Sequence, residues 1–132
     1  MVVTACITNS YVKCIMIDIG SSIDILYLDA FHELGMTNRD LIPMTSTLTG
    51  FTDDAITPEG VATLPVTFGD EPRIKTLMVH FMVVDLPSAY NVIIGRPTLN
   101  KLRAIVSTDH RSMKFPTSAG PGEIKNDPRE LR

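Results

Sequence analysis

The chain has 132 residues, 44% of them hydrophobic and 20% charged, with a formal net charge of −3 at pH 7. This length suits one domain of about 100–150 residues, and the apolar fraction excludes an intrinsically disordered chain. Twelve Lys and Arg residues against fifteen Asp and Glu leave no positive excess to collect phosphates, so we expect no nucleic acid partner for this domain.

The first predicted elements are two strands, Val2–Ile7 and Tyr11–Ile17, that form a hairpin. Both are rich in apolar and β-branched residues, and the Asn-Ser pair at 9–10 favours a turn. A two-residue turn at that pair places the sulfur atoms of Cys6 and Cys14 on opposite faces of the hairpin. A three-residue loop would instead place the two cysteines opposite each other, so the sequence leaves their disulfide state open.

A short helix and further strands come next. Apolar residues within Tyr27–Gly35 recur at helical spacing, and the glycine lies where a left-handed residue ends a helix. Met44–Phe51 and Val61–Phe68 are predicted to form the arms of a long hairpin with a polar tip. Ile74–Val84 is predicted to be another strand.

The C-terminal part contains short elements and a polar end. A strand, a helix and a final pair of strands are expected over Asn91–Gly95, Thr98–Arg103, Ala104–Thr108 and Ser112–Phe115. From Pro116 onward the composition is Pro, Gly, Ser and charged residues. We therefore expect a folded domain over 1–115 and a disordered tail or linker over 116–132.

Cysteine and histidine usage predicts no metal site. The two cysteines and three scattered histidines do not match a structural zinc site, which needs about four ligands at close spacing. The N-terminal segment lacks the basic leader of a signal peptide, and no stretch approaches the roughly 20 apolar residues of a membrane span. These features predict an intracellular, cytoplasmic protein with reduced thiols, no membrane association and no cofactor.

One stretch carries candidate chemistry: Asp18, Ile19, Gly20, Ser21 and Ser22 directly follow an apolar strand. A carboxylate at the end of a core strand costs several kcal/mol unless hydrogen-bond donors reach it. The glycine lets the backbone turn and bring amides close, and the two hydroxyls can donate. Such a carboxyl can serve as an acid or a base, although an aspartate that only caps a turn is an equally common arrangement.

Two motifs in this order resemble those of a known family. Asp18–Ser22 resembles the Asp-Thr/Ser-Gly signature of retropepsin-like aspartic proteases, and Val92–Arg96 resembles their second fingerprint, an apolar pair followed by Gly-Arg. The run from Val2 to about Phe115 is similar to the protease segment of plant gypsy-type retrotransposon Gag-Pol polyproteins. Particular matches are residues 20–26, 58–60, 64–66 and 88–99.

The resemblance implies an all-β fold: a closed retropepsin-like barrel with one or two short helices and one lobe per chain. It implies an aspartic endopeptidase that cleaves a polyprotein as a homodimer, because the chemistry needs two carboxyls that share a proton. This chain holds one aspartate in an Asp-x-Gly-Ser context, Asp18. One carboxyl acts as base on a water and the other as acid toward the scissile carbonyl, which favours mildly acidic pH.

The resemblance also assigns roles around Asp18. Gly20 and Ser21 shape the loop, and Ser22 hydrogen-bonds the Asp18 carboxylate. The hairpin around 50–60 is expected to be a flap that closes over an extended peptide substrate. The substrate-binding residues of this flap are Gly50, Phe51, Thr52, Asp53, Asp54 and Ala55. Three residues are expected to pack behind the Asp18 loop, mostly as part of the core: Ile93, Ile94 and Gly95.

Ile19 departs from the family pattern. The family usually has Thr or Ser at this position, and that hydroxyl joins a cross-subunit hydrogen-bond network beneath the two aspartates. Isoleucine has no donor or acceptor, and losing the network costs about a few kcal/mol of dimer stability or leaves the aspartates poorly oriented. The alternative function is therefore a catalytically inactive dimerisation or peptide-binding domain from a degenerate retrotransposon copy. A start so close to the first strand is also compatible with a fragment of a longer polyprotein.

Overall fold

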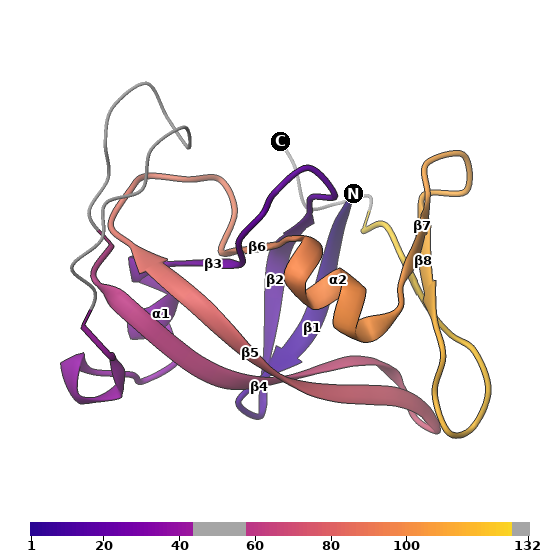
Figure 1. Cartoon of the computed structure of the whole chain (residues 1–132), viewed down its shortest axis with the longest axis horizontal. Coiled ribbons are helices and arrows are strands. Elements are labelled where there is room, and N and C mark those ends of the chain that lie inside the picture. The colour runs from indigo at the N-terminus through magenta and orange to yellow at the C-terminus, as the bar shows by residue number, and fades with distance from the viewer. Residues whose placement is uncertain (44–57, 128–132) are drawn as a thin grey trace.

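A closed β-barrel forms the body of the molecule (Figure 1). The computed structural model describes residues 1–43 and 58–127. Around the barrel the strands follow the order β1 (Val2–Ile7), β2 (Ser10–Ile17), β6 (Val92–Ile94), β3 (Ile25–Tyr27), β5 (Arg73–Val84) and β4 (Gly60–Asp70), and β4 pairs with β1. With its short helices, this arrangement confirms the predicted all-β fold with a closed barrel.

The β1–β2 hairpin has a different turn from the predicted one. Thr8 and Asn9 form the turn with φ of 51° and 67°, and both angles lie in the left-handed region that a type I′ turn requires. Asn tolerates this region well. With Asn9 as the second turn residue, the turn lies one residue earlier than predicted, and each cross-strand partner near it shifts by two positions. Cys6 is a free thiol opposite Tyr11, so the direct pairing of Cys6 with Cys14 that a three-residue loop would give is wrong.

The β4–β5 hairpin is the longest strand pair and runs along the length of the molecule (Figure 1). Its register extends from Gly60 opposite Val83 to Asp70 opposite Arg73. Alternate residues of β4 are buried: Ala62, Leu64, Val66 and Phe68. This is the period-2 pattern of a half-buried strand, and burying each large side chain contributes about 1.5–3 kcal/mol.

The predicted flap lies outside the described residues except for residues 58–60. The predicted strand Met44–Phe51 and the substrate-binding candidates Gly50–Ala55 also lie outside them. The described residues on either side of this segment meet. Ile42 and Val61 exchange two backbone hydrogen bonds of 2.9 Å as an antiparallel bridge. Ile42, close before this segment in the sequence, therefore lies beside β4.

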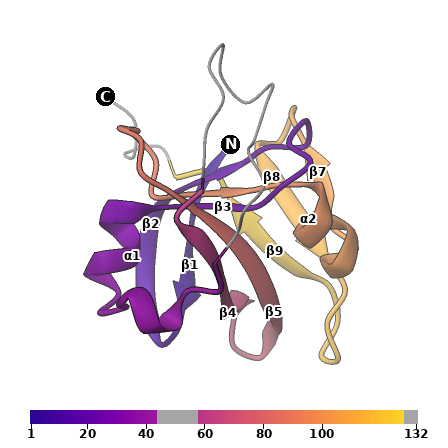
Figure 2. The ribbon, with the colours of Figure 1, turned by 60° about the vertical axis from the view of Figure 1, so that its left-hand side comes forward.

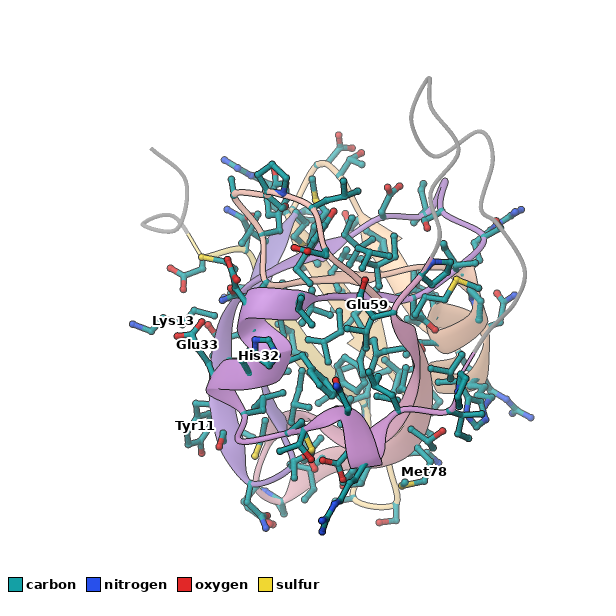
Figure 3. The ribbon with its side chains drawn as sticks, turned by 90° about the vertical axis from the view of Figure 1, so that its left-hand side faces the viewer. Tyr11, Lys13, His32, Glu33, Glu59 and Met78 are labelled. Atoms are coloured by element: carbon teal, nitrogen blue, oxygen red, sulfur yellow. The ribbon has the colours of Figure 1, made fainter. Side chains whose placement is uncertain are left out.

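Two short α-helices cover the barrel on different sides (Figure 2). Helix α1 (Leu28–Glu33) buries Ala30 and Phe31 in the core, whereas His32 and Glu33 point outward (Figure 3). A left-handed Gly35, with φ of 80°, follows it as predicted. The other helix is α2 (Arg96–Leu102), and a 3-10 turn spans Asn38–Asp40. No helix among residues 1–43 and 58–127 is long and apolar enough to cross a membrane.

A second, smaller sheet corrects the predicted tail. It contains β7 (Ile105–Ser107), β8 (Ser112–Phe115) and β9 (Gly122–Lys125), in that order. Strand β9 pairs along the whole of β8, so the segment after Phe115 belongs to the fold up to Asp127. The Asp127 amide donates to the carbonyl oxygen of Val2 at 2.8 Å, which ties the C-terminal segment to β1.

The reason for this error is a contact between paired residues of β8 and β9. Gly122 lies against the Phe115 ring, where an added Cβ would stand 2.8 Å from a ring carbon. A single half-buried residue in β9, Ile124, completes the inner face of the sheet. One glycine and one isoleucine among polar residues produce no periodic signal, so composition alone predicted disorder.

Candidate active site

Asp18 directly follows the buried strand β2, and the neighbouring strand β6 fixes its backbone. The two strands are parallel, with Ile17 opposite Ile94. The next amide, that of Asp18, donates to the carbonyl oxygen of Ile94 at 2.9 Å. Because Ile17 and Ile94 are both buried core residues, the position of Asp18 is set by the barrel rather than by a free loop.

The turn after Asp18 orients its carboxylate. The Gly20 amide donates to Asp18 Oδ1 at 2.9 Å, and the Ser21 amide donates to the Asp18 carbonyl oxygen at 3.2 Å. Asp18 is half-buried, whereas the Ile19 side chain is 61% exposed. The carboxylate is therefore held in one orientation at the surface end of a core strand.

The predicted contact between Ser22 and the Asp18 carboxylate is wrong. Ser22 is exposed, and within the described residues the side-chain contact to Asp18 comes from the Gly20 amide. The Ser21 hydroxyl donates to the carbonyl oxygen of Ile23 at 2.7 Å instead. The glycine lets the backbone turn sharply and bring its amide to the carboxylate, whereas the Ser22 side chain is exposed to solvent.

The second fingerprint lies directly behind this loop. The Arg96 amide donates to the Ser21 carbonyl oxygen at 2.9 Å. Gly95 is so close that an added Cβ would stand 2.8 Å from the Ser21 carbonyl oxygen and closer still to that of Ile23. Ile94 is buried, and half-buried Ile93 pairs opposite Ile25. The two motifs that lie far apart in the sequence therefore form one unit.

Comparison with known proteins bears on this architecture. No protein-family model matches the sequence, and no curated protein matches it closely. Among solved structures, the retroviral protease-like domain of Ddi1 from Leishmania major superposes with a TM-score of 0.71 at 16% identity, covering 100% of this chain and 96% of that one. The fold is retropepsin-like.

Two further structures support the same fold. The EIAV protease complexed with the inhibitor HBY-793 gives a TM-score of 0.58 at 18% identity, covering 81% of this chain and 91% of that chain. A retropepsin-like aspartic protease from Rickettsia conorii gives 0.59 at 17% identity, covering 93% and 80%. At these identities the likeness establishes the retropepsin-like fold alone.

A second aspartate, Asp24, lies at the other end of the loop and was missed because it does not stand in an Asp-x-Gly-Ser context. Asp24 is only 5% exposed. Its Oδ1 accepts the Gly95 amide and its Oδ2 accepts the Thr98 hydroxyl, both at 2.7 Å. Burial raises the pKa of the Asp24 carboxyl above its usual 3.8, and these hydrogen bonds and the nearby Lys101 charge partly offset the rise. The available signal was a carboxylate between two isoleucines at the start of a buried strand.

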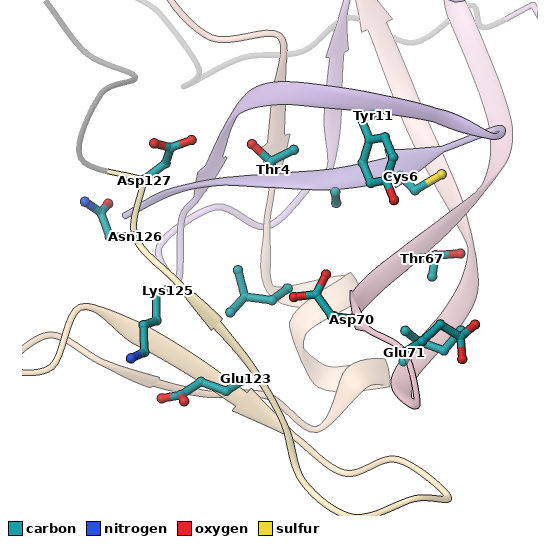
Figure 4. A pocket seen from close by; sticks show the side chains of 14 residues that line it. Thr4, Cys6, Tyr11, Thr67, Asp70, Glu71, Glu123, Lys125, Asn126 and Asp127 are labelled. Carbon is teal, nitrogen blue, oxygen red and sulfur yellow. The ribbon is translucent and has the colours of Figure 1, made fainter.

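One hollow of the molecule lies away from the candidate site residues. A hollow of about 850 Å³ lies between β1, the β4–β5 turn and β9 (Figure 4). Its charged lining is mostly acidic: Asp70, Glu71, Glu123, Lys125 and Asp127. No predicted site residue lines it, so the size of this hollow does not identify the active site.

Within the described ranges, no group of three or more His, Cys, Asp or Glu side chains could hold a metal ion.

Proposed function

We propose that this chain is one half of a homodimeric aspartic endopeptidase. The observation that carries the proposal is the Asp18 carboxylate, held by the Gly20 amide at the surface end of β2 on a retropepsin-like fold. One chain supplies one such carboxyl, and hydrolysis by this chemistry needs two. Exposure of Ile19 and Gly20 beside Asp18 leaves room for a second copy to approach the loop.

In the dimer, two Asp18 carboxyls face one water molecule and share one proton, because two adjacent carboxylates repel each other. The ionised carboxyl takes a proton from the water as its oxygen attacks the scissile carbonyl carbon. The protonated carboxyl gives its proton to the carbonyl oxygen. As the tetrahedral intermediate collapses, the carboxyl that took the water's proton gives it to the leaving nitrogen and the C–N bond breaks. The other carboxyl, now ionised, takes a proton from a hydroxyl of the intermediate as the carbonyl re-forms, so the pair again shares one proton. The Gly20 amide keeps each carboxylate in orientation throughout.

The proposed substrate is an extended segment of the polyprotein of a plant gypsy-type retrotransposon, processed inside the cell. This finer assignment rests on the sequence resemblance across residues 2–115. Residues Gly50–Ala55 are proposed to bind the substrate backbone. In the sequence they lie between Ile42 and Val61, the two residues that form a backbone bridge.

A second candidate function follows from Ile19. Its side chain is 61% exposed next to Asp18 and offers no hydrogen bond to a partner subunit. This observation favours an inactive domain of the same fold that dimerises or binds peptides. The two candidates differ in whether paired Asp18 carboxyls still cleave a peptide bond.

A peptidase assay at mildly acidic pH, with and without pepstatin, separates the two candidates. We expect the parent protein to cleave a peptide in a pepstatin-sensitive manner and Asp18→Asn to abolish cleavage, because Asn can neither take up nor give the shared proton. Circular dichroism and size-exclusion chromatography check that Asp18→Asn remains folded and paired. Equal cleavage by the parent and Asp18→Asn would refute the mechanism.

Ile19→Thr tests the second candidate in the same assay. Restoring a hydroxyl beside Asp18 should raise the activity of the dimer by strengthening the contact between subunits. A silent parent together with an active Ile19→Thr variant would favour the inactive domain. A strictly monomeric parent at micromolar concentration would argue against the endopeptidase, because one chain cannot assemble two carboxyls.

A further inference from the structure

The loop between β2 and β3 is fastened to the β6–α2 junction by four hydrogen bonds, and two of these end on one carboxylate. They run from Asp18 N to Ile94 O at 2.9 Å, from Arg96 N to Ser21 O at 2.9 Å, from Gly95 N to Asp24 Oδ1 at 2.7 Å and from Thr98 Oγ1 to Asp24 Oδ2 at 2.7 Å. Asp18 lies at one end of the loop and Asp24 at the other. The two aspartates, at opposite ends of the loop, therefore both contact the β6–α2 junction.

Gly95 lies at the centre of these four hydrogen bonds. The residue before it, Ile94, accepts the Asp18 amide, and the residue after it, Arg96, donates to Ser21. The Gly95 amide between them donates to Asp24. Glycine has no side chain to anchor it, so the Asp24 carboxylate fixes the Ile94–Gly95 peptide, whose carbonyl oxygen accepts the Asp18 amide. The adjoining Gly95–Arg96 peptide donates to Ser21.

We propose that Asp24 is a positioning residue for Asp18: its carboxylate holds Gly95 and Thr98 in place, and the β6–α2 junction in turn holds the candidate catalytic loop. This inference rests on the proposed endopeptidase function. Asp24 does not act on the substrate itself, because it is 5% exposed and both of its oxygens already accept donors. Its raised pKa is the mark of a carboxyl enclosed by the fold.

Two substitutions at Asp24 separate positioning from loss of folded protein. Asp24→Asn keeps an oxygen to accept the Gly95 amide and gains an NH₂ group that can donate to the Thr98 hydroxyl oxygen. Asp24→Ala removes both acceptors. Asp109→Ala, at an exposed aspartate of the β7–β8 turn, is the matched control for loss of an aspartate.

The measurement is kcat and KM per active site, with sites counted by pepstatin titration so that unfolded molecules do not contribute. We expect Asp24→Ala to lower kcat at least about tenfold with KM within about twofold, because loop geometry affects the reacting carboxyl more than peptide binding. Asp24→Asn should stay within about threefold of the parent. The proposal is overturned if Asp24→Ala has the same kcat per titrated site as Asp109→Ala.

Thr98 provides a milder test if Asp24→Ala fails to fold. Thr98→Val removes one donor to Asp24 and retains the side-chain volume, whereas Thr98→Ser retains the hydroxyl. We expect Thr98→Val to lower kcat per site about threefold and Thr98→Ser to restore it. Equal kcat per site for Thr98→Val and Thr98→Ser would contradict the proposal.

Amide hydrogen exchange tests the fastening without any peptidase activity. In Asp24→Ala, or in Thr98→Val if the former does not fold, the Gly95 and Asp18 amides should exchange at least about threefold faster than in the parent, while β4 amides stay protected. An inactive parent would refute the proposed function and leave this measurement to decide the role of Asp24. Unchanged exchange at Gly95 and Asp18 would overturn that role whether or not the parent is active.

Discussion

Asp18 and Asp24 stand at the two ends of one loop and meet opposite environments. Asp18 is half-buried, and among residues 1–43 and 58–127 its carboxylate accepts a single backbone amide, from Gly20. Asp24 is 5% exposed, and its two oxygens accept the Gly95 amide and the Thr98 hydroxyl. The first carboxylate is oriented and reachable, whereas the second is enclosed and satisfied. Exposure and donor count therefore distinguish a candidate catalytic carboxyl from a positioning one where residue type does not.

We expect the largest loss of stability from a substitution at Gly95, whose amide donates to Asp24. Gly95→Ala would press a methyl group against the carbonyl oxygens of Ser21 and Ile23, which are backbone atoms that cannot rotate away. We expect the free energy of unfolding to fall by about 3 kcal/mol, the upper part of the usual range for overpacking. Urea denaturation followed by circular dichroism measures this change. A loss of less than about 1 kcal/mol would show that the loop and the β6–α2 junction are not tightly packed.

The next prediction concerns the pH dependence of stability. Because the folded-state pKa of Asp24 is raised above 3.8, the folded protein holds this proton more tightly than the unfolded chain does. The contribution of Asp24 to stability is full below 3.8 and is lost as the pH rises through the folded-state pKa. Asp24→Asn does not titrate, so its stability relative to the parent should increase over that window.

Denaturation midpoints of the parent and Asp24→Asn, measured between about pH 3 and about pH 8, provide this comparison. Asp18→Asn is the matched control, since it makes the same substitution at the other end of the loop. Parallel pH curves for the parent and Asp24→Asn would show that burial of Asp24 does not alter its protonation.

Local patterns in the sequence account for much of the barrel. Alternating burial along β4, the helical spacing before Gly35 and the two apolar motifs each act over a few residues, so a single sequence shows them. The β1–β2 turn was predicted one residue too late because both possible turns contain Asn9, and only backbone angles decide between them. Strand β9 was missed because its place depends on Gly122 fitting against Phe115.

In the candidate site, too, contacts between residues close in the sequence were predicted and contacts between distant residues were not. Asp18 and its glycine are adjacent in sequence, and the predicted approach of a backbone amide is confirmed by the contact from Gly20. Asp24 receives its donors from Gly95 and Thr98, which are 71 and 74 positions away. Contacts over such separations are set by the pairing of β2 with β6, which no local motif encodes.

We expect the smallest effect on stability from a substitution at Gly20, which contacts Asp18, in contrast to the large effect at Gly95. Gly20 is exposed, and an added Cβ would meet a single atom, Asp18 Oδ1, at 3.3 Å. Gly20→Ala should therefore change the free energy of unfolding by less than about 1 kcal/mol. The same methyl group crowds the carboxylate, so kcat should fall about threefold to tenfold as Asp18 rotates away from its amide donor. Urea denaturation and the peptidase assay on one preparation measure both quantities, and a loss of stability without a loss of kcat would reverse the roles assigned to the two ends of the loop.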